Sequence, residues 1–223
     1  MLYVGNGCSP TKQEWLVDWD WTPPTDHPIK RRRQVVAYKN RFITVFDDVV
    51  GFVGARWHWW WSIRWIPGRR PRYLRIEEAG GWPGAAVLAT CDDLVALVLV
   101  YRYPQGKWEW GIPRGFAKSD DPAATMRSEL DEELGAEPRQ THPLGVIRSN
   151  SGLIAGHTAL FHAEYKTPVA QPKDRREVRQ VRWIPVPDLA AAICAGHITD
   201  GFTLSALTAA AVRGVIHLPT AVA

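Results

Sequence analysis

Polar and apolar residues alternate at two different periods along this chain, and the change of period predicts strands first and helices later. Residues 34–40 (QVVAYKN) and 41–53 (RFITVFDDVVGFV) are typical of strands, with turn signals at Lys39-Asn40 and at Asp47-Asp48. In residues 57–65 every second position is Trp or Ile, and the positions between them are His, Trp, Ser and Arg. A period of two is that of a half-buried strand. These patterns predict a small antiparallel β domain over residues 30–81.

Beyond the Gly- and Pro-rich boundary at residues 80–84, apolar runs and helical patterns follow one another. The run AAVLAT and the run LVALVLVYRY predict two strands around a turn at residues 91–93, and we interpret the following QGKWEWGIPRGFAKSDDP as a loop. Gly135 predicts the end of a helix. The remaining predicted elements are a helix at about 123–134, strands near 144–148, 157–165 and 178–184, and helices near 187–195 and 202–213.

This order of elements predicts an α/β domain over residues 82–217, preceded by an irregular arm at 1–29 and followed by a short tail at 218–223. Of the 223 residues, 46% are hydrophobic and 22% charged, which argues against disorder. No apolar run approaches the roughly 18 residues of a membrane span. Three widely separated cysteines and the absence of a secretory start predict a cytoplasmic protein. The net charge of +4 is too small to indicate a nucleic-acid partner.

The predicted helix at 123–134 carries the clearest chemical signal. Glu129, Glu132 and Glu133 have i, i+3, i+4 spacing, which places three carboxylates on one helix face. Such a cluster suits a hard divalent cation, and a solvated acidic face is the alternative. The loop before the helix, residues 113–116, contains Gly115, where the backbone can approach a phosphate or a metal closely. A glycine loop followed by an acidic helix predicts a site for a metal-bound diphosphate.

These residues resemble the sequence box of the Nudix hydrolase family. That box is G, five residues, E, seven residues, R-E-U, one residue, E-E, one residue, G-U, where U is aliphatic. The chain has Gly115, Glu129-Leu130, Glu132-Glu133 and Gly135-Ala136 in matching order. The segments YKNRFITVFDD, YRYPQGKWEWGIPRGF and GHITDGFTLSALTAA look like the ADP-ribose pyrophosphatase branch of the family. The resemblance spans roughly residues 36–213.

Two departures from the family pattern lie in the box. The spacing from residue 115 to residue 129 is one position shorter than in the family, so the family's first glutamate corresponds to Asp121 or Asp120. Ser128 stands where the family has an arginine that orients the acidic side chains, and the adjacent Arg127 points about 100° away on a helix. The three central carboxylates are retained.

The resemblance implies a Nudix α/β/α sandwich with a mixed sheet, preceded by a small antiparallel β domain that forms a homodimer. It implies hydrolysis of the pyrophosphate bond of ADP-ribose or a nucleotide sugar, giving AMP and a sugar phosphate, without a membrane or nucleic-acid partner. Mg²⁺ or Mn²⁺ would be held by the three glutamates and a carbonyl near Gly115. Glu132, Glu133 and Glu177 would be catalytic, with Asp174 as the alternative base. Substrate would be bound by Arg102, Arg114, Gly115 and Phe116.

Several alternatives stay open at this stage. If the protein is an enzyme, the alternative to ADP-ribose or a nucleotide sugar as substrate is a dinucleotide such as NADH. Outside it, the altered box and the Trp-rich strand at 57–65 are compatible with a weakly active or inactive ligand sensor or nucleic-acid binder. Glu177 and Arg102 are equally compatible with surface ion pairs. His157 and His162 are interpreted as structural histidines, since no metal-ligand spacing accompanies them.

Overall fold

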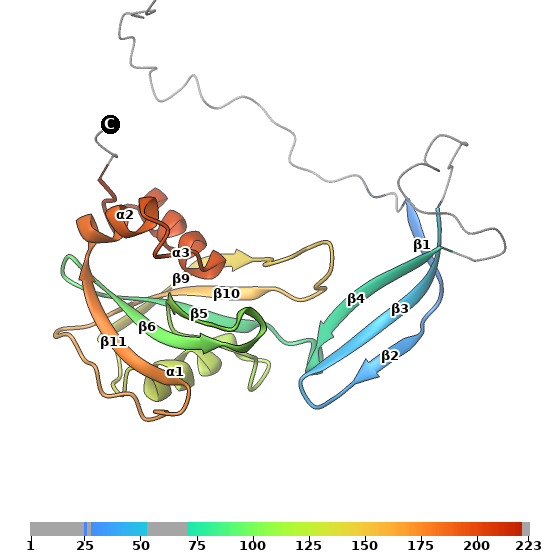
Figure 1. The fold of residues 1–223 in the computed structure, drawn as a ribbon, viewed down its shortest axis with the longest axis horizontal. Helices are drawn as coiled ribbons and strands as arrows, with labels where there is room; N and C mark the ends of the chain where they lie inside the picture. Colours follow the sequence, from blue (N-terminus) through green and yellow to red (C-terminus); the bar gives the residue numbers. More distant parts are fainter. Residues whose placement is uncertain (1–24, 26–27, 53–70, 220–223) are drawn as a thin grey trace, which may run out of the picture.

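The computed structural model describes residue 25 and residues 28–52 and 71–219, which form two β-sheets and the helices that cover the larger one (Figure 1). The Trp-rich strand at 57–65 and all of the predicted arm except residues 25, 28 and 29 lie outside the described residues. The predicted class, an α/β sandwich with a mixed sheet preceded by a small antiparallel sheet, is confirmed. Among the described helices, none is long and apolar enough to cross a membrane.

The smaller sheet is antiparallel and is built around its longest strand. β4 pairs with β3 along one edge, and β1 and β2 pair with successive parts of the other edge. The strands are β1 (Ile29–Arg33), β2 (Val36–Lys39), β3 (Ile43–Phe52) and β4 (Arg72–Glu78).

The predicted turn at Asp47-Asp48 is wrong, because β3 continues through both residues. Each aspartate has an arginine partner across the sheet. Asp48 is 2% exposed and its Oδ2 lies 2.7 Å from Arg75 Nε, while Asp47 pairs with Arg72. These ion pairs let two turn-forming residues stay inside a strand.

The larger sheet is mixed, with the strand order β11-β6-β5-β10-β9. β5 and β10 are parallel, the other pairs are antiparallel, and β7 and β8 add to β6 and β5. Its strands are β5 (Gly84–Cys91), β6 (Leu94–Arg102), β7 (Lys107–Gly111), β8 (Arg114–Gly115), β9 (Gln140–Ile147), β10 (Thr158–Glu164) and β11 (Val178–Pro185).

Period-two alternation in β5 divides the core between the two faces of this sheet. Val87 and its odd-numbered neighbours pack with Met126 and Leu130 of α1. Ala86 and Leu88 face the opposite layer and pack with residues of α2 and α3 such as Leu207. All of these side chains are 2% exposed or less, so the sheet is covered on both faces. The helices are α1 (Pro122–Glu133), α2 (Val186–Cys194) and α3 (Gly201–Val212).

The segment KWEWG was interpreted as part of a loop, and this was wrong. It forms β7, which pairs with the end of β6 in a hairpin. Gly106 permits the tight connection because its φ is +65°, and its N–H donates to the Arg102 carbonyl. The high local content of Gly and Pro concealed an alternating Lys-Trp-Glu-Trp pattern.

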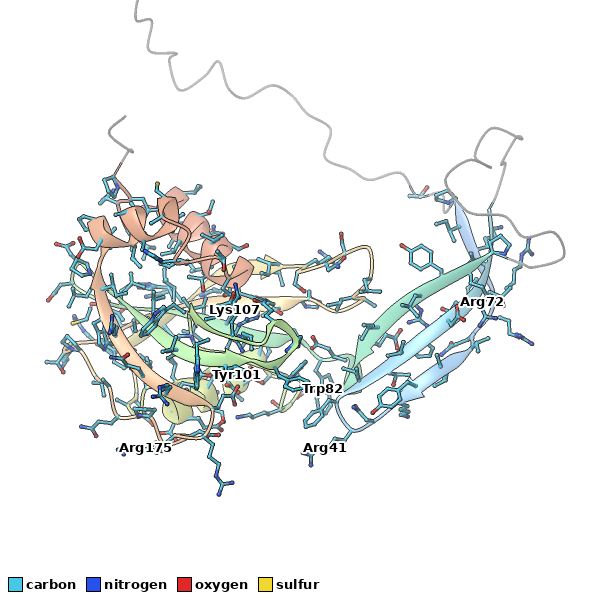
Figure 2. All side chains as sticks on the ribbon, viewed as in Figure 1. Arg41, Arg72, Trp82, Tyr101, Lys107 and Arg175 are labelled. Atoms are coloured by element: carbon cyan, nitrogen blue, oxygen red, sulfur yellow. The ribbon has the colours of Figure 1, made fainter. Side chains whose placement is uncertain are left out.

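The two sheets meet through the loop that connects β9 to β10. Ile76 of β4 forms an isolated bridge with Ile154, and the hydroxyl of Tyr73 donates to the Gly152 carbonyl at 3.1 Å. Trp82, which is 42% exposed, lies at the junction where the chain passes from β4 to β5 (Figure 2). The small sheet is therefore attached beside the end of the larger one.

Candidate active site

The acidic helix α1 has a defined start and a defined end. The side chain of Asp121 is its N-cap and accepts from the Ala123 N–H at 2.9 Å. Gly135, with a φ of +80°, ends it, and a Cβ there would collide with the carbonyl oxygen of Gln171. Asp121, one of the two aspartates that the resemblance sets against the family's first glutamate, thus serves as a helix cap. Its carboxylate also forms a 3.4 Å ion pair with Arg127.

The side chain of Glu129 lies directly against Gly115. Glu129 is 6% exposed, and a Cβ on Gly115 would overlap its carboxyl group. Burial is the main cause that raises the pKa of Glu129, and Lys118 opposes the increase. A glycine at 115 is therefore required by the close approach of the Glu129 carboxylate to the loop backbone, whereas the sequence had suggested a phosphate or a metal as the close neighbour.

Glu132 is held by two neighbours instead of an arginine. Its Oε1 accepts from Ser128 Oγ at 2.8 Å and from Lys118 Nζ at 2.5 Å. These hydrogen bonds, led by that of Lys118, lower the pKa of Glu132. Ser128, which occupies the position of the family's arginine, therefore still orients one carboxylate of the cluster.

Glu133 is the most deeply buried of the three carboxylates. It is 4% exposed, and its Oε2 has no hydrogen-bond partner among the described residues. Burial, followed by the charges of Glu129 and Glu177, raises its pKa well above the ordinary value. Arg102 and a hydrogen bond from the Arg114 backbone act in the opposite direction. A buried carboxylate without a full set of partners is costly unless a ligand completes its contacts.

Glu129 lies within electrostatic reach of both Glu132 and Glu133, but the three carboxylates face different partners. Glu129 and Glu132 share the Lys118 ammonium, and Glu133 turns toward Arg114. Within the described part of the chain, no three His, Cys, Asp or Glu side chains are gathered around one point as metal ligands would be. The residues nevertheless fit a hard divalent cation, because all three side chains offer carboxylate oxygens and Glu133 Oε2 has no hydrogen-bond partner among the described residues.

The loop that carries Glu177 is fastened to the C-terminal end of α1. The N–H groups of Lys173 and Asp174 donate to the Glu132 carbonyl at 2.8 and 3.1 Å, and that of Gln171 donates to the Leu134 carbonyl at 3.0 Å. This loop places the Glu177 charge close enough to raise the pKa of two of the α1 carboxylates.

Asp174 and Glu177 have different surroundings. Asp174 Oδ1 accepts from the N–H groups of Arg176 and Glu177, so this carboxylate stabilises its own turn. The side chain of Glu177 is exposed and has no ion pair among the described residues. Of the two sequence candidates for a base, Glu177 has the carboxylate that is free to contact water.

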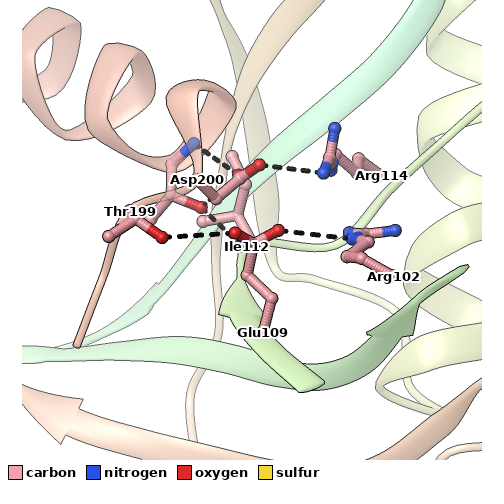
Figure 3. A network of polar contacts seen from close by, with 7 residues as sticks. Arg102, Glu109, Ile112, Arg114, Thr199 and Asp200 are labelled. Carbon is pink, nitrogen blue, oxygen red and sulfur yellow. Dashed lines mark hydrogen bonds and ion pairs between the residues drawn. The ribbon is translucent and has the colours of Figure 1, made fainter. Parts of the chain in front are cut away.

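A cavity of about 420 Å³ lies at the start of α3, and most residues of the polar network drawn in Figure 3 line it. Arg102 and Arg114 line it, each with a buried carboxylate partner. Arg114 Nη2 lies 2.8 Å from Asp200 Oδ1, and Arg102 Nε lies 3.6 Å from Glu109 Oε2. The cavity is also lined by Pro104, Gln105, Ile147, Arg148, Ser149, Thr199, Gly201, Phe202 and Ser205. Its size is that of a small-molecule site.

Asp200 joins this cavity to the start of α3. It is the N-cap of α3, and its Oδ2 accepts from the N–H and the hydroxyl of Thr203 at 2.9 and 2.7 Å. The same hydroxyl accepts from the Ile112 N–H at 3.0 Å (Figure 3). The Arg114 guanidinium therefore pairs with one oxygen of a carboxylate whose other oxygen is fixed by Thr203.

Phe116 does not line this cavity. Its ring is 57% exposed and stacks on Phe42 of the small sheet, with 6.3 Å between the ring centroids. In this structure it contributes to the contact between the two sheets.

Sequence reasoning did not single out Lys118, Glu109, Asp200 or Arg148. Asp200 carried one usable signal, an Asp-Gly pair immediately before a predicted helix, which is typical of an N-cap. Glu109 and Lys118 lay in the segment interpreted as a loop. Arg148 ended a predicted strand and carried no signal of its own.

Comparison with known proteins identifies the family of this site. The NUDIX domain pattern matches residues 82–202, which is more than half of the chain. A hydrolase from Streptomyces rubellomurinus, CMP-5'-(N-acetyl-N-hydroxy-3-aminopropyl)phosphonate hydrolase, is 26% identical over 141 residues, which cover 61% of this chain and 68% of the relative. A crystal structure of an ADP compounds hydrolase has a TM-score of 0.64 at 16% identity and covers 86% of this chain and 96% of its own. That likeness supports the fold alone.

Proposed function

The chain belongs to the Nudix family of hydrolases, and on this premise we propose that it cleaves the pyrophosphate bond of ADP-ribose or a nucleotide sugar in a reaction that depends on Mg²⁺ or Mn²⁺. The observation that carries the proposal is the buried Glu133. Its Oε2 lacks a hydrogen-bond partner among the described residues, and Arg102 and Arg114, which both act to lower its pKa, line a cavity. Glu129, Glu132, Glu133 and the backbone carbonyl of Gly115 would hold the cation. When bound, it would neutralise phosphate charge and lower the pKa of a water molecule.

The chain's own residues supply the remaining functions. Glu177 accepts the proton of the attacking water, since its carboxylate is exposed and near the α1 carboxylates. The water oxygen bonds to phosphorus as the bridging P–O bond breaks, so that ADP-ribose and water give AMP and ribose 5-phosphate. Arg102 and Arg114 line the cavity as fixed guanidinium groups for the phosphates of the substrate.

We propose a homodimer formed through the small sheet. Its apolar side chains are unusually exposed for a sheet: Ile29 40%, Val36 54%, Tyr38 55%, Phe42 48%, Tyr73 39% and Leu74 50%. Light scattering of the full chain tests this proposal, and a concentration-independent monomer would contradict it. The cytoplasm stays the predicted compartment.

The proposed activity is tested by incubating the protein with ADP-ribose, a nucleotide sugar, NADH and a CMP-linked phosphonate, with Mg²⁺ or Mn²⁺, and measuring the products released. The last compound is included because the curated relative is named for such a substrate. Glu133→Gln should abolish turnover while the circular dichroism spectrum stays unchanged. If wild type and variant are equally inert and a nucleotide still raises the melting temperature, the protein is a ligand sensor.

A further inference from the structure

Lys118 is in an unusual position for a surface lysine. Its Nζ lies 2.5 Å from Glu132 Oε1, 2.9 Å from Ser128 Oγ and 3.1 Å from Glu129 Oε1. Three oxygens of α1 therefore surround one ammonium group, and two of them belong to carboxylates that would hold the cation.

The backbone at Lys118 is tied to the same helix. Its N–H donates to Thr125 Oγ1 at 3.2 Å, and Thr125 is fully buried. The loop from residue 116 to residue 121 is thus attached at the lysine itself, so the side chain starts from a fixed point one helical turn from Glu129. Such a tether keeps the local concentration of the ammonium group high.

One carboxylate oxygen cannot be fully engaged by an ammonium group and a divalent cation at the same position. Lys118 contacts Oε1 of both Glu129 and Glu132, so binding of a metal ion by this pair has to break at least part of these contacts. We propose that Lys118 is a tethered counter-cation that occupies the divalent-cation position and is displaced when the metal ion binds. This inference rests on the proposed metal-dependent function.

The arrangement has two consequences. Without a metal ion, Lys118 offsets the repulsion between two neighbouring carboxylates and keeps them close together. With a metal ion present, breaking its contacts lowers the apparent affinity, because the ion has to compete with a group already attached to the site. Lys118 is a positioning residue in this scheme, since it acts through Glu129 and Glu132 and takes no part in bond breaking.

The test is calorimetric titration of the full chain with MnCl₂, comparing wild type with Lys118→Gln. Loss of a charged competitor should tighten Mn²⁺ binding about tenfold. Lys173→Gln is the matched control, because Lys173 also pairs with an α1 carboxylate, Asp131 at 2.6 Å, on an exposed part of the helix. It should leave Mn²⁺ affinity unchanged. Lys118→Arg keeps the charge and should bind Mn²⁺ no more tightly than wild type.

Each outcome decides the matter. Unchanged or weaker Mn²⁺ binding by Lys118→Gln overturns the inference, and the proposed function stands if wild type binds the ion and hydrolyses its substrate. Absence of Mn²⁺ uptake by both proteins overturns the inference and the metal-dependent function together. Should Lys118→Gln fail to fold, Mn²⁺ binding by Lys118→Arg that exceeds wild type would contradict the inference by itself.

Discussion

Glu133→Gln should make the metal-free protein more stable while it removes activity. The substitution keeps the size of the side chain and deletes its charge, and one amide oxygen can still accept from the Arg114 backbone. In the wild type, burial and the charges of Glu129 and Glu177 raise the pKa of Glu133. Above the unfolded-state pKa of this residue, about 4.5, the folded state therefore holds more protons than the unfolded state, and the free energy of unfolding falls as pH rises.

The size of the effect follows from the buried charge that the substitution deletes, because the amide of Gln would still leave one polar atom without a partner. Desolvating a buried group costs about 1–3 kcal/mol, and more when the group is charged, so we take about 1–3 kcal/mol for the charge itself. For a domain of this size, each kcal/mol corresponds to about 2–4 °C in melting temperature, which gives an increase of about 2–12 °C at pH 7.5. A metal ion at 100 times its dissociation constant stabilises the wild type by about 2.7 kcal/mol. Saturating Mn²⁺ should therefore reduce or reverse the difference in melting temperature between Glu133→Gln and wild type.

The assay is thermal unfolding of both proteins at several values between pH 5 and pH 8, first with a chelator and then with Mn²⁺. The stabilisation by Glu133→Gln should grow with pH in the chelator and shrink when Mn²⁺ is added. Asp131→Asn is the control, because it removes an exposed carboxylate of the same helix and should change the melting temperature little. A Glu133→Gln protein less stable than wild type in the chelator at pH 7.5 would refute the reasoning.

Three further predictions concern other parts of the structure. Gly115→Ala should lower kcat about 100-fold, because a Cβ there displaces Glu129; a kcat within twofold of wild type contradicts this. Arg114→Met should lower the free energy of unfolding in urea by about 3–5 kcal/mol, since it leaves the buried Asp200 unpaired. Burial lowers the pKa of His162. Below about pH 6.5 the unfolded state therefore binds more protons than the folded state, and the free energy of unfolding decreases as the pH is lowered. In His162→Asn this acid-dependent loss, followed by thermal unfolding from pH 7.5 to pH 5, should be smaller than in wild type.

The parts of the fold that depend on local sequence were predictable. α1 was predicted within a residue at each end, and the glycine at its C-terminal end was the local signal used. The N-cap Asp121, which the structure shows, lies in the same short segment. β5 and β6 were evident as apolar runs around a short turn. The register of the three glutamates followed from helical geometry alone, without any knowledge of the tertiary structure.

Features that depend on contacts between distant segments could not be predicted in the same way. Asp47 and Asp48 are turn formers by composition, and only the arginines of β4 keep them in a strand. At the cavity Arg114 pairs with Asp200, which is 86 positions further along the chain. Lys118 contacts its carboxylates because the loop folds back on α1, and a count of residues cannot show that folding back.

The loop carrying Glu177 is joined to the end of α1 by main-chain hydrogen bonds from residues 171, 173 and 174. Main-chain hydrogen bonds persist through most side-chain replacements, but an insertion or a deletion in the loop would break them. The amino acids of this loop are thus free to diverge so long as its length is preserved. A single-residue deletion between residues 174 and 177 would move the Glu177 carboxylate away from α1 without altering any proposed metal ligand. Such a length variant would separate proton transfer from cation binding.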